Sequence, residues 1–155
     1  MRIRIEATDL PGRTCAAPAA EGVTAYPNVH VGVQRRGRPG ELLGLQPGDA
    51  PAATWTLDTT AEQTPAGTDV RGPYVQGGPG RRFVHLSWGS VDDAGAFAVF
   101  RRAKLLLDAV PADVLAAAAR TGLLVGRLGL TDARGMPLCA RVVPPVVTWT
   151  AGADR

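Results

Sequence analysis

The residues best suited to chemistry lie in a glycine- and proline-rich stretch, residues 69–89. His85 and Ser87 are two positions apart, so in an extended segment their side chains point to the same side. Histidine titrates near neutral pH, which makes His85 the candidate catalytic residue, as a general base. Ser87 is not in a G-x-S-x-G elbow, so no serine nucleophile is indicated. The structural alternative for His85 is a half-buried side chain bonded to a backbone carbonyl.

Four further residues of this stretch are candidate ligand-binding residues: Arg71, Tyr74, Arg82 and Trp88. An arginine can hold a carboxylate or a phosphate through two parallel hydrogen bonds, and a run of glycine amides such as 77–80 can add an anion nest. The phosphate-loop pattern is absent, because no Lys-Ser or Lys-Thr follows these glycines. Three of the four have a structural alternative: Arg71 can tie to Asp69, Arg82 can be an ordinary surface arginine of a solvated loop, and Trp88 can pack in the core.

No spacing in the sequence supports a metal, nucleotide or flavin site. The chain has two histidines, His30 and His85, and neither of its cysteines belongs to a C-x-x-C pair. We therefore predict no metal and no bound cofactor. Cys15 and Cys139 are expected to be reduced and inert, with a single disulfide as the alternative in an oxidising compartment.

Length and composition predict one soluble domain that spans residues 1–155. The chain has 155 residues, of which 45% are hydrophobic and 20% charged, and its net charge is +3. The basic residues occur in scattered pairs and not in a dense stripe, which makes nucleic acid a weak alternative partner. The start of the chain has no signal-peptide core, and no apolar run reaches the ~20 residues of a membrane span. We expect a cytoplasmic protein that does not associate with membranes.

Period-two patterns predict a chain built mainly of short strands. The predicted strands are residues 2–8, 28–36, 41–45, 52–59, 70–76, 82–88, 123–131, 136–143 and 146–150, with a polar turn at 60–68. Residues 70–76 and 82–88 are expected to pair as a hairpin around the glycine turn, with Val84, Leu86 and Trp88 on one face. Residues 13–27, rich in alanine, proline and glycine, are expected to form a loop that is either mobile or a lid.

A change of period near residue 96 predicts a pair of helices. Phe97, Phe100 and Leu107 share a face at helical spacing, which favours a helix over residues 96–107. Pro111 suits the first position of a second helix over 111–120. Because helices do not alternate with strands, the predicted fold is α+β. It is mainly an antiparallel β-sandwich or a partly open barrel, and the helical insert, about 93–121, packs on one face or end.

Several segments resemble a family of small actinobacterial proteins of unknown function. The resemblance covers most of the chain and rests on residues 69–75, 82–89, 100–105 and 129–141. Asp-Val-Arg-Gly-Pro-Tyr-Val at 69–75 and the segment 129–141 are its most specific parts. The resemblance implies no activity and transfers no catalytic residue. An arginine-rich composition, in which Lys104 is the single lysine, fits such a source.

The clustering of these candidate residues around one turn predicts a site for a small organic molecule in the mouth of a β-rich fold. The enzymatic version is a cofactor-independent isomerase or cyclase that acts on an apolar or acidic metabolite, and the sequence leaves open whether the protein is an enzyme. The alternatives are a non-catalytic interaction module, a homodimer formed through an exposed strand edge, and a weak nucleic-acid binder. The leading hypothesis requires that the cationic and aromatic side chains of the hairpin share one concave space.

Overall fold

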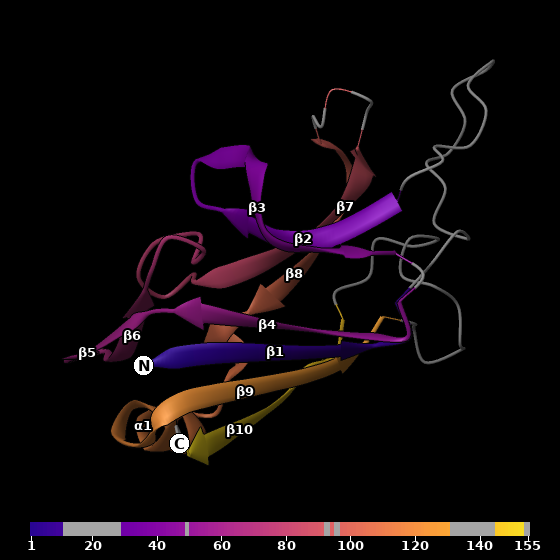
Figure 1. Cartoon of the computed structure of the whole chain (residues 1–155). Helices are drawn as coiled ribbons and strands as arrows, with labels where there is room; N and C mark the ends of the chain where they lie inside the picture. Colours follow the sequence, from indigo (N-terminus) through magenta and orange to yellow (C-terminus); the bar gives the residue numbers. More distant parts are fainter. Residues whose placement is uncertain (11–28, 49, 92–93, 95–96, 131–144, 154–155) are drawn as a thin grey trace.

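In the part of the chain that the structure describes, the fold consists of two four-stranded β-sheets, a two-stranded ribbon and a late helix (Figure 1). The computed structural model describes residues 1–10, 29–48, 50–91, 94, 97–130 and 145–153. Within these residues, two four-stranded sheets lie one above the other in Figure 1, and a two-stranded ribbon and an α-helix lie at one end of them. The fold is α+β, as predicted, with antiparallel and mixed sheets that do not close into a barrel.

The first sheet has the strand order β10-β9-β1-β4. Its strands are β1 (Arg2–Thr8), β4 (Ala52–Asp58), β9 (Gly122–Gly129) and β10 (Thr148–Ala153). β1 lies antiparallel to β4 and parallel to β9, so this sheet is mixed and not purely antiparallel. The predicted alternation is confirmed, because Ile3 and Ile5 of β1 and Trp55 and Leu57 of β4 are all buried.

The second sheet has the order β3-β2-β7-β8, and its neighbouring strands are antiparallel. Its strands are β2 (Val29–Arg35), β3 (Arg38–Pro47), β7 (Phe83–Val91) and β8 (Phe97–Leu106). As predicted, Val84, Leu86 and Trp88 of β7 are buried. They join the apolar side chains of the first sheet in one hydrophobic cluster, which is the core of the fold.

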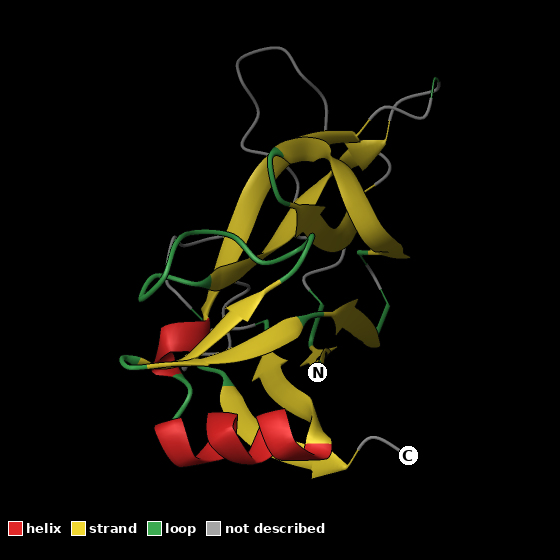
Figure 2. Cartoon of the chain, turned by 90° about the vertical axis from the view of Figure 1, so that its left-hand side faces the viewer, coloured by secondary structure: helices red, strands yellow, loops and turns green. Residues whose placement is uncertain are grey.

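The ribbon and the helix complete the fold. The ribbon consists of β5 (Thr60–Thr64) and β6 (Gly67–Arg71), which pair antiparallel. After β8, a 3-10 turn at Leu107–Ala109 leads to helix α1 (Ala112–Thr121), which confirms the second predicted helix. α1 buries Leu115 and Ala118 and packs along β9 and β10 (Figure 2). Gly122 ends the helix with a φ of 87°, a left-handed conformation that glycine adopts without strain.

The first of the two predicted helices is wrong, because residues 97–106 form β8. The same sequence also fits a period of two: Ala103 and Leu105 are buried, whereas Arg102 and Lys104 are exposed. Tertiary pairing decides between the two patterns, since the backbone groups of β7 are paired with β8 along its length. The predicted helical insert therefore contains a strand before its helix.

The predicted hairpin between residues 70–76 and 82–88 is also wrong. Residues 70 and 71 belong to β6, which pairs with β5, and β5 lies where a turn was expected. Pro73 lacks a backbone N–H, and the amide of Val75 donates to the carbonyl of Gly72 at 3.1 Å, so the chain turns here instead of extending. Of the predicted pairing, Gln76 still meets Phe83, as an isolated bridge.

Some predictions fall outside the described residues. These are the loop at 13–27, the strand at 136–143, and the state of Cys15 and Cys139. Among the residues that are described, no helix combines the length and the apolar character needed to cross a bilayer.

Candidate functional site

A cavity of about 660 Å³ lies where the β5–β6 ribbon, the turn at residues 79–80 and the start of α1 meet. Its apolar wall is formed mainly by Leu107, Val110, Ala112, Leu115 and Ala116. Its charged wall is formed by Asp69, Arg71, Arg82 and Asp108. A cavity of this size, with an apolar wall and a few convergent polar groups, is typical of small-molecule sites.

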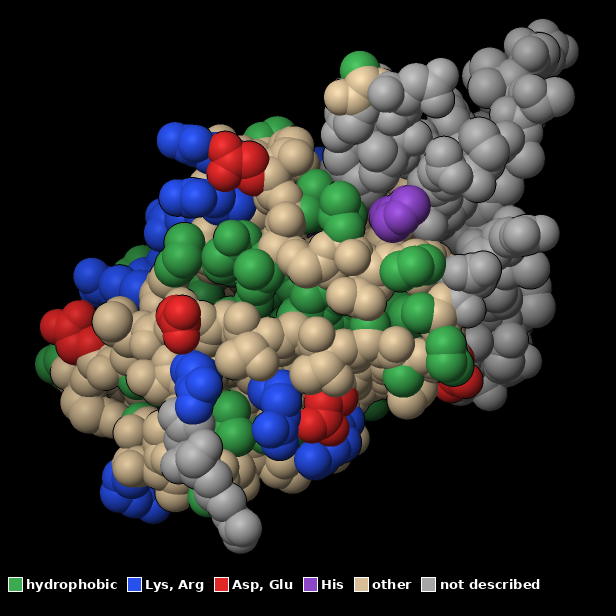
Figure 3. Space-filling view, in the orientation of Figure 1, with side chains coloured by type: hydrophobic (Ala, Val, Ile, Leu, Met, Phe, Trp, Pro, Cys, Tyr) green, Lys and Arg blue, Asp and Glu red, His purple; other side chains and the backbone are tan. Residues whose placement is uncertain are grey.

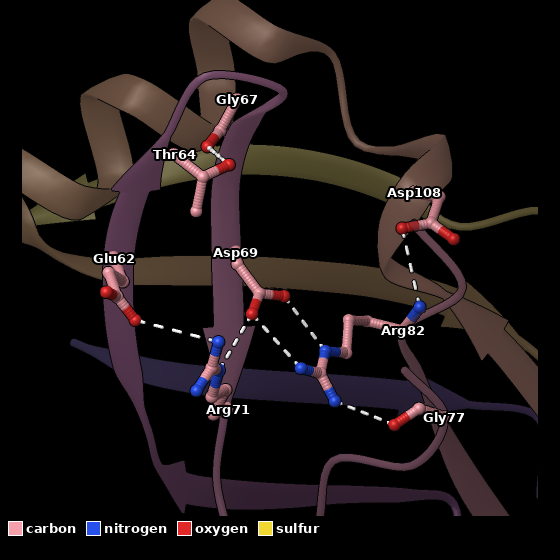
Figure 4. Close-up of polar contacts among 8 residues, drawn as sticks. All are labelled: Glu62, Thr64, Gly67, Asp69, Arg71, Gly77, Arg82 and Asp108. Atoms are coloured by element: carbon pink, nitrogen blue, oxygen red, sulfur yellow. Dashed lines mark hydrogen bonds and ion pairs between the residues drawn. The ribbon is translucent and has the colours of Figure 1, made fainter. Parts of the chain in front are cut away.

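The charged wall is organised by a buried ion pair between Asp69 and Arg82 (Figure 4). Arg82 donates from Nε to Asp69 Oδ1 at 2.9 Å and from Nη2 to Asp69 Oδ2 at 3.0 Å. Its Nη1 donates to the carbonyl oxygen of Gly77 at 2.7 Å. The side chains of Arg82 and Asp69 are 6% and 7% exposed, so this two-pronged contact is shielded from water. All three nitrogens of the guanidinium are engaged, and Arg82 is therefore a structural residue of the wall.

Asp69 is held in its charged form. Hydrogen bonds from Arg82 first and Arg71 second lower the pKa of its carboxyl far below the ordinary 3.8, against the opposing effect of burial. A carboxylate with such a low pKa does not take up a proton near neutral pH. Asp69 is thus a poor general base, and its role is to hold two guanidinium groups in place.

Arg71 is the half-exposed cation of this wall. Its Nε donates to Asp69 Oδ2 at 2.8 Å, and its Nη2 lies 3.7 Å from Glu62 Oε2 (Figure 4). The side chain is 53% exposed, and its pKa is raised, chiefly by the hydrogen bond to Asp69. Its Nη groups donate no hydrogen bond to the described residues. Apart from the ion pair of Nη2 with Glu62, these donors are available to an acceptor group of a ligand.

Two turns position these side chains. Thr64 Oγ1 donates to the carbonyl of Gly67 at 2.8 Å and closes the ribbon, where Gly67 has a φ of 120°. The second turn requires Gly77, because its φ is 80° and a Cβ there would overlap the carbonyl oxygen of Arg81. This turn brings the Gly77 carbonyl to the guanidinium of Arg82. A larger residue at position 77 would therefore displace one end of the buried ion pair.

His85 lies on the outer side of β7 and is not among the cavity-lining residues. Its ring centroid is 4.7 Å from that of Phe83, and Lys104 is its direct cross-strand neighbour. Burial, followed by the charges of Arg102 and Lys104, lowers the pKa of His85 from 6.5 to about 4. Its Nδ1 is buried without a hydrogen-bond partner among the described residues. The imidazole is therefore neutral at neutral pH.

The structure places two of the five predicted site residues at the cavity. Arg71 and Arg82 line it, whereas Tyr74, His85 and Trp88 do not. Trp88 is buried in the core and Tyr74 packs against it. For the two residues of β7, the cause is the alternation of the strand, which directs Trp88 inward and His85 outward. The single concave space expected around one turn is therefore not what the geometry shows.

Sequence reasoning missed Asp69 as the centre of the charged wall, and it missed Asp108 and α1 as parts of the cavity. One signal was available, because the spacing of Asp69 and Arg71 puts both side chains on the same side of a strand. No sequence pattern links Arg82 or α1 to that pair, since these contacts are tertiary. Within the described ranges, no three His, Cys, Asp or Glu side chains are grouped so that they could hold a metal ion.

Comparison with known proteins places the chain in a family. A family model described as "Family of unknown function (DUF5990)" matches residues 1–152. No curated protein and no solved structure matches the chain. Because the model covers nearly the whole sequence, the chain belongs to this family of unknown function.

Proposed function

We propose that this member of a family of unknown function binds a small organic molecule in the cavity between the β5–β6 ribbon and α1. The observation that carries the proposal is the half-exposed guanidinium of Arg71 beside an apolar wall. A ligand that matches both features has an apolar body and one acceptor group, such as a carboxylate. Such a ligand agrees with the apolar or acidic metabolite expected from the sequence, but of the predicted site residues only Arg71 and Arg82 line the cavity.

The buried pair supports this role by preorganising Arg71. Asp69 is fixed by Arg82, and Arg71 is in turn fixed by Asp69 through one hydrogen bond at 2.8 Å. A guanidinium that is already oriented loses little freedom when a carboxylate docks on it. The charge of Arg71 is offset by Asp69 and by Glu62, so the apolar wall supplies a large part of the affinity.

Binding is proposed without a chemical step. His85 does not line the cavity, and Asp69 is held charged by two arginines. An isomerase or cyclase would need a proton acceptor within reach of the ligand. Asp108 is the other carboxylate of the lining, and the backbone N–H of Arg82 donates to it at 3.4 Å. A catalytic version of the proposal therefore depends on Asp108 and not on His85.

The test is a titration of the protein with amphiphilic monocarboxylates of increasing chain length, followed by amide chemical shifts. We expect saturable shifts at cavity residues such as Val110 and Ala116. Arg71→Gln should weaken carboxylate binding about tenfold, the loss expected for one charge-assisted contact. Arg120→Gln, which removes an exposed charge from the far end of α1, is the matched control. Shifts confined to other surfaces, or equal affinities for the two variants, would contradict the proposal.

A homodimer remains the alternative partner arrangement. Leu45 on β3 and Leu106 on β8 are about two-fifths exposed, at 41% and 40%, and these strands are the two edges of the second sheet. Concentration-dependent sedimentation tests this alternative, and Leu45→Asp and Leu106→Asp should then shift the equilibrium towards monomer. An actinobacterial source and a cytoplasmic location both stay predictions from the sequence.

A further inference from the structure

The outer side of β7 and β8 carries a second cluster of polar side chains, separate from the cavity. Arg102 and Lys104 are two positions apart in β8, so they share one side of the strand. Their cross-strand partners in β7 are Ser87 and His85. Neighbours paired in this way have their Cβ atoms within about 5.5 Å of each other, so the four side chains form one patch. None of them lines the cavity.

Arg102 is oriented by a buried neutral side chain. Its Nε donates to Gln34 Oε1 at 2.8 Å, and the same oxygen accepts the hydroxyl of Ser87 at 3.2 Å. Gln34 is 8% exposed and Ser87 is fully buried, so this support is rigid. Gln76 also contacts β2, because its Nε2 donates to the backbone carbonyl of Gln34 at 3.2 Å. The two Nη groups of Arg102 donate no hydrogen bond to the described residues.

Lys104 and His85 complete the patch. The ammonium of Lys104 lies 4.1 Å from the centroid of the Phe83 ring, a cation–π contact that holds it above β7. The His85 ring lies against the same phenyl group, at 4.7 Å between centroids. Both cations are near enough to the imidazole to disfavour its protonation. The three nitrogen-bearing groups therefore converge on one region of the surface.

The charge of this patch is not balanced by nearby acids. Within the described ranges, no carboxylate forms an ion pair with Arg102 or Lys104. By contrast, the described arginines that form such pairs include Arg4, Arg35, Arg38, Arg71, Arg82 and Arg127. On the face of the molecule that Figure 3 shows, red carboxylates lie beside most of the blue groups. Two unpaired cations held on a supported surface attract an anion of matching charge.

We propose that Arg102, Lys104 and His85 form a second binding site, which takes a phosphate monoester group. A monoester carries nearly two negative charges at neutral pH, which matches the two cations. The Nη groups of Arg102 suit two phosphate oxygens at once, and Lys104 acts as a point charge on a third. The neutral imidazole of His85 contributes one N–H donor. The site is independent of the cavity and does not rest on the function proposed for it.

The probe is inorganic phosphate, added to the full chain at neutral pH and followed by the imidazole resonances of His85. Potassium chloride at the same ionic strength is the reference. We expect a saturable shift with phosphate and none with chloride. Arg102→Gln and Lys104→Gln should each weaken phosphate binding about tenfold, since each removes one charge-assisted contact. Arg120→Gln removes the same charge elsewhere and should bind phosphate as the parent does.

The outcomes separate the proposal from its competitors. A phosphate effect equal to that of chloride overturns it, as do three variants with equal affinity. A short single-stranded oligonucleotide, whose phosphodiesters carry one charge each, is added in a parallel titration. Tight binding of the oligonucleotide without binding of phosphate would assign the patch to nucleic acid, which is the weak alternative of the sequence. Amide spectra of each variant confirm that it is folded, which is expected because both substituted side chains are exposed.

Discussion

Beside the cavity, Arg82 is buried against the carboxylate of Asp69, whereas on the outer side of the second sheet Arg102 is bonded to the neutral amide of Gln34. Both guanidinium groups are held by a buried partner, but the charge is cancelled only in the first. The buried ion pair stabilises the fold, because removing one partner would leave the other charge buried and unpaired. An uncancelled charge on a fixed side chain stays available for an incoming anion. Of these two arginines, Arg82 therefore belongs to the fold, and the charge of Arg102 is available for a ligand.

The largest expected effect is that of Asp69→Asn. This substitution removes the charge that Arg71 and Arg82 share and leaves Arg82 buried without a carboxylate. We expect a loss on the order of 3 kcal/mol in the free energy of unfolding, measured by urea denaturation. The matched control is Asp108→Asn, which removes an exposed carboxylate from the same cavity and should change stability little. Equal losses in the two variants would remove Asp69 from its central role.

The second prediction concerns the pH dependence of His85. Its pKa is lowered to about 4 in the folded chain, so between 6.5 and 4 the unfolded chain takes up a proton that the folded chain resists. Because solvent screens the half-buried ring, stability should fall by only about 1–2 kcal/mol as the pH drops through this window, with no contribution above it. Asp69 acts in a separate window, because its stabilisation is present above 3.8 and is lost only as the pH falls further.

Denaturation curves at several pH values check this separation of the two regions. In His85→Gln the fall between pH 6.5 and 4 should be smaller than in the parent, whatever the starting stability of the variant. An unchanged slope would mean that another group titrates in this window.

A smaller effect is expected for Arg71→Gln. The side chain is half exposed, and pairs of this kind add little to stability. Asp69 also keeps its two bonds to Arg82. Urea denaturation should show a loss far below that of Asp69→Asn, together with the weaker ligand binding proposed above. A large loss would show that Arg71, like Arg82, belongs to the fold and not to a site.

The smallest change is expected in the titration of His85 itself. Arg102→Gln should raise the pKa of His85, and Lys104→Gln should raise it less, because Arg102 is the larger of the two charge effects. Burial has the largest effect on this pKa and is kept in both variants, so neither should restore it to 6.5. Imidazole resonances followed against pH give the pKa of His85 in the parent and in the two variants, and so the order of these three values. The reverse order would mean that Lys104 is the closer cation.

Sequence reasoning worked best where alternation and burial coincide. In β1 and β4, apolar side chains alternate with polar ones, and a strand is the only regular element that this pattern suits. In β8 it failed, because Phe97, Phe100 and Leu107 also satisfy a helical period. A strand forms there because β8 pairs with β7, and the local sequence does not reveal this pairing.

The candidate site was predictable only in part, for a related reason. Arg71 stands out because it lies two residues from Asp69 in one strand. Arg82 reaches Asp69 from another segment, and the apolar wall comes from α1. Side chains that come together from three separate elements have no characteristic spacing in the sequence, so no motif reveals them. His85, the predicted catalytic residue, lies outside the cavity lining, because its side of β7 depends on where the core lies.

The parallel pairing of β1 with β9 determines the order in which the strands of the first sheet can pair during synthesis. β1 takes one neighbour from residues 52–58 and the other from residues 123–129. During translation, β1 leaves the ribosome long before its second neighbour exists. β1 can pair with β9 only after residue 129 has emerged from the ribosome. Until then, one edge of β1, which carries Ile3 and Ile5, has no neighbouring strand. Nascent chains halted before that point should be sensitive to protease and bound by chaperones.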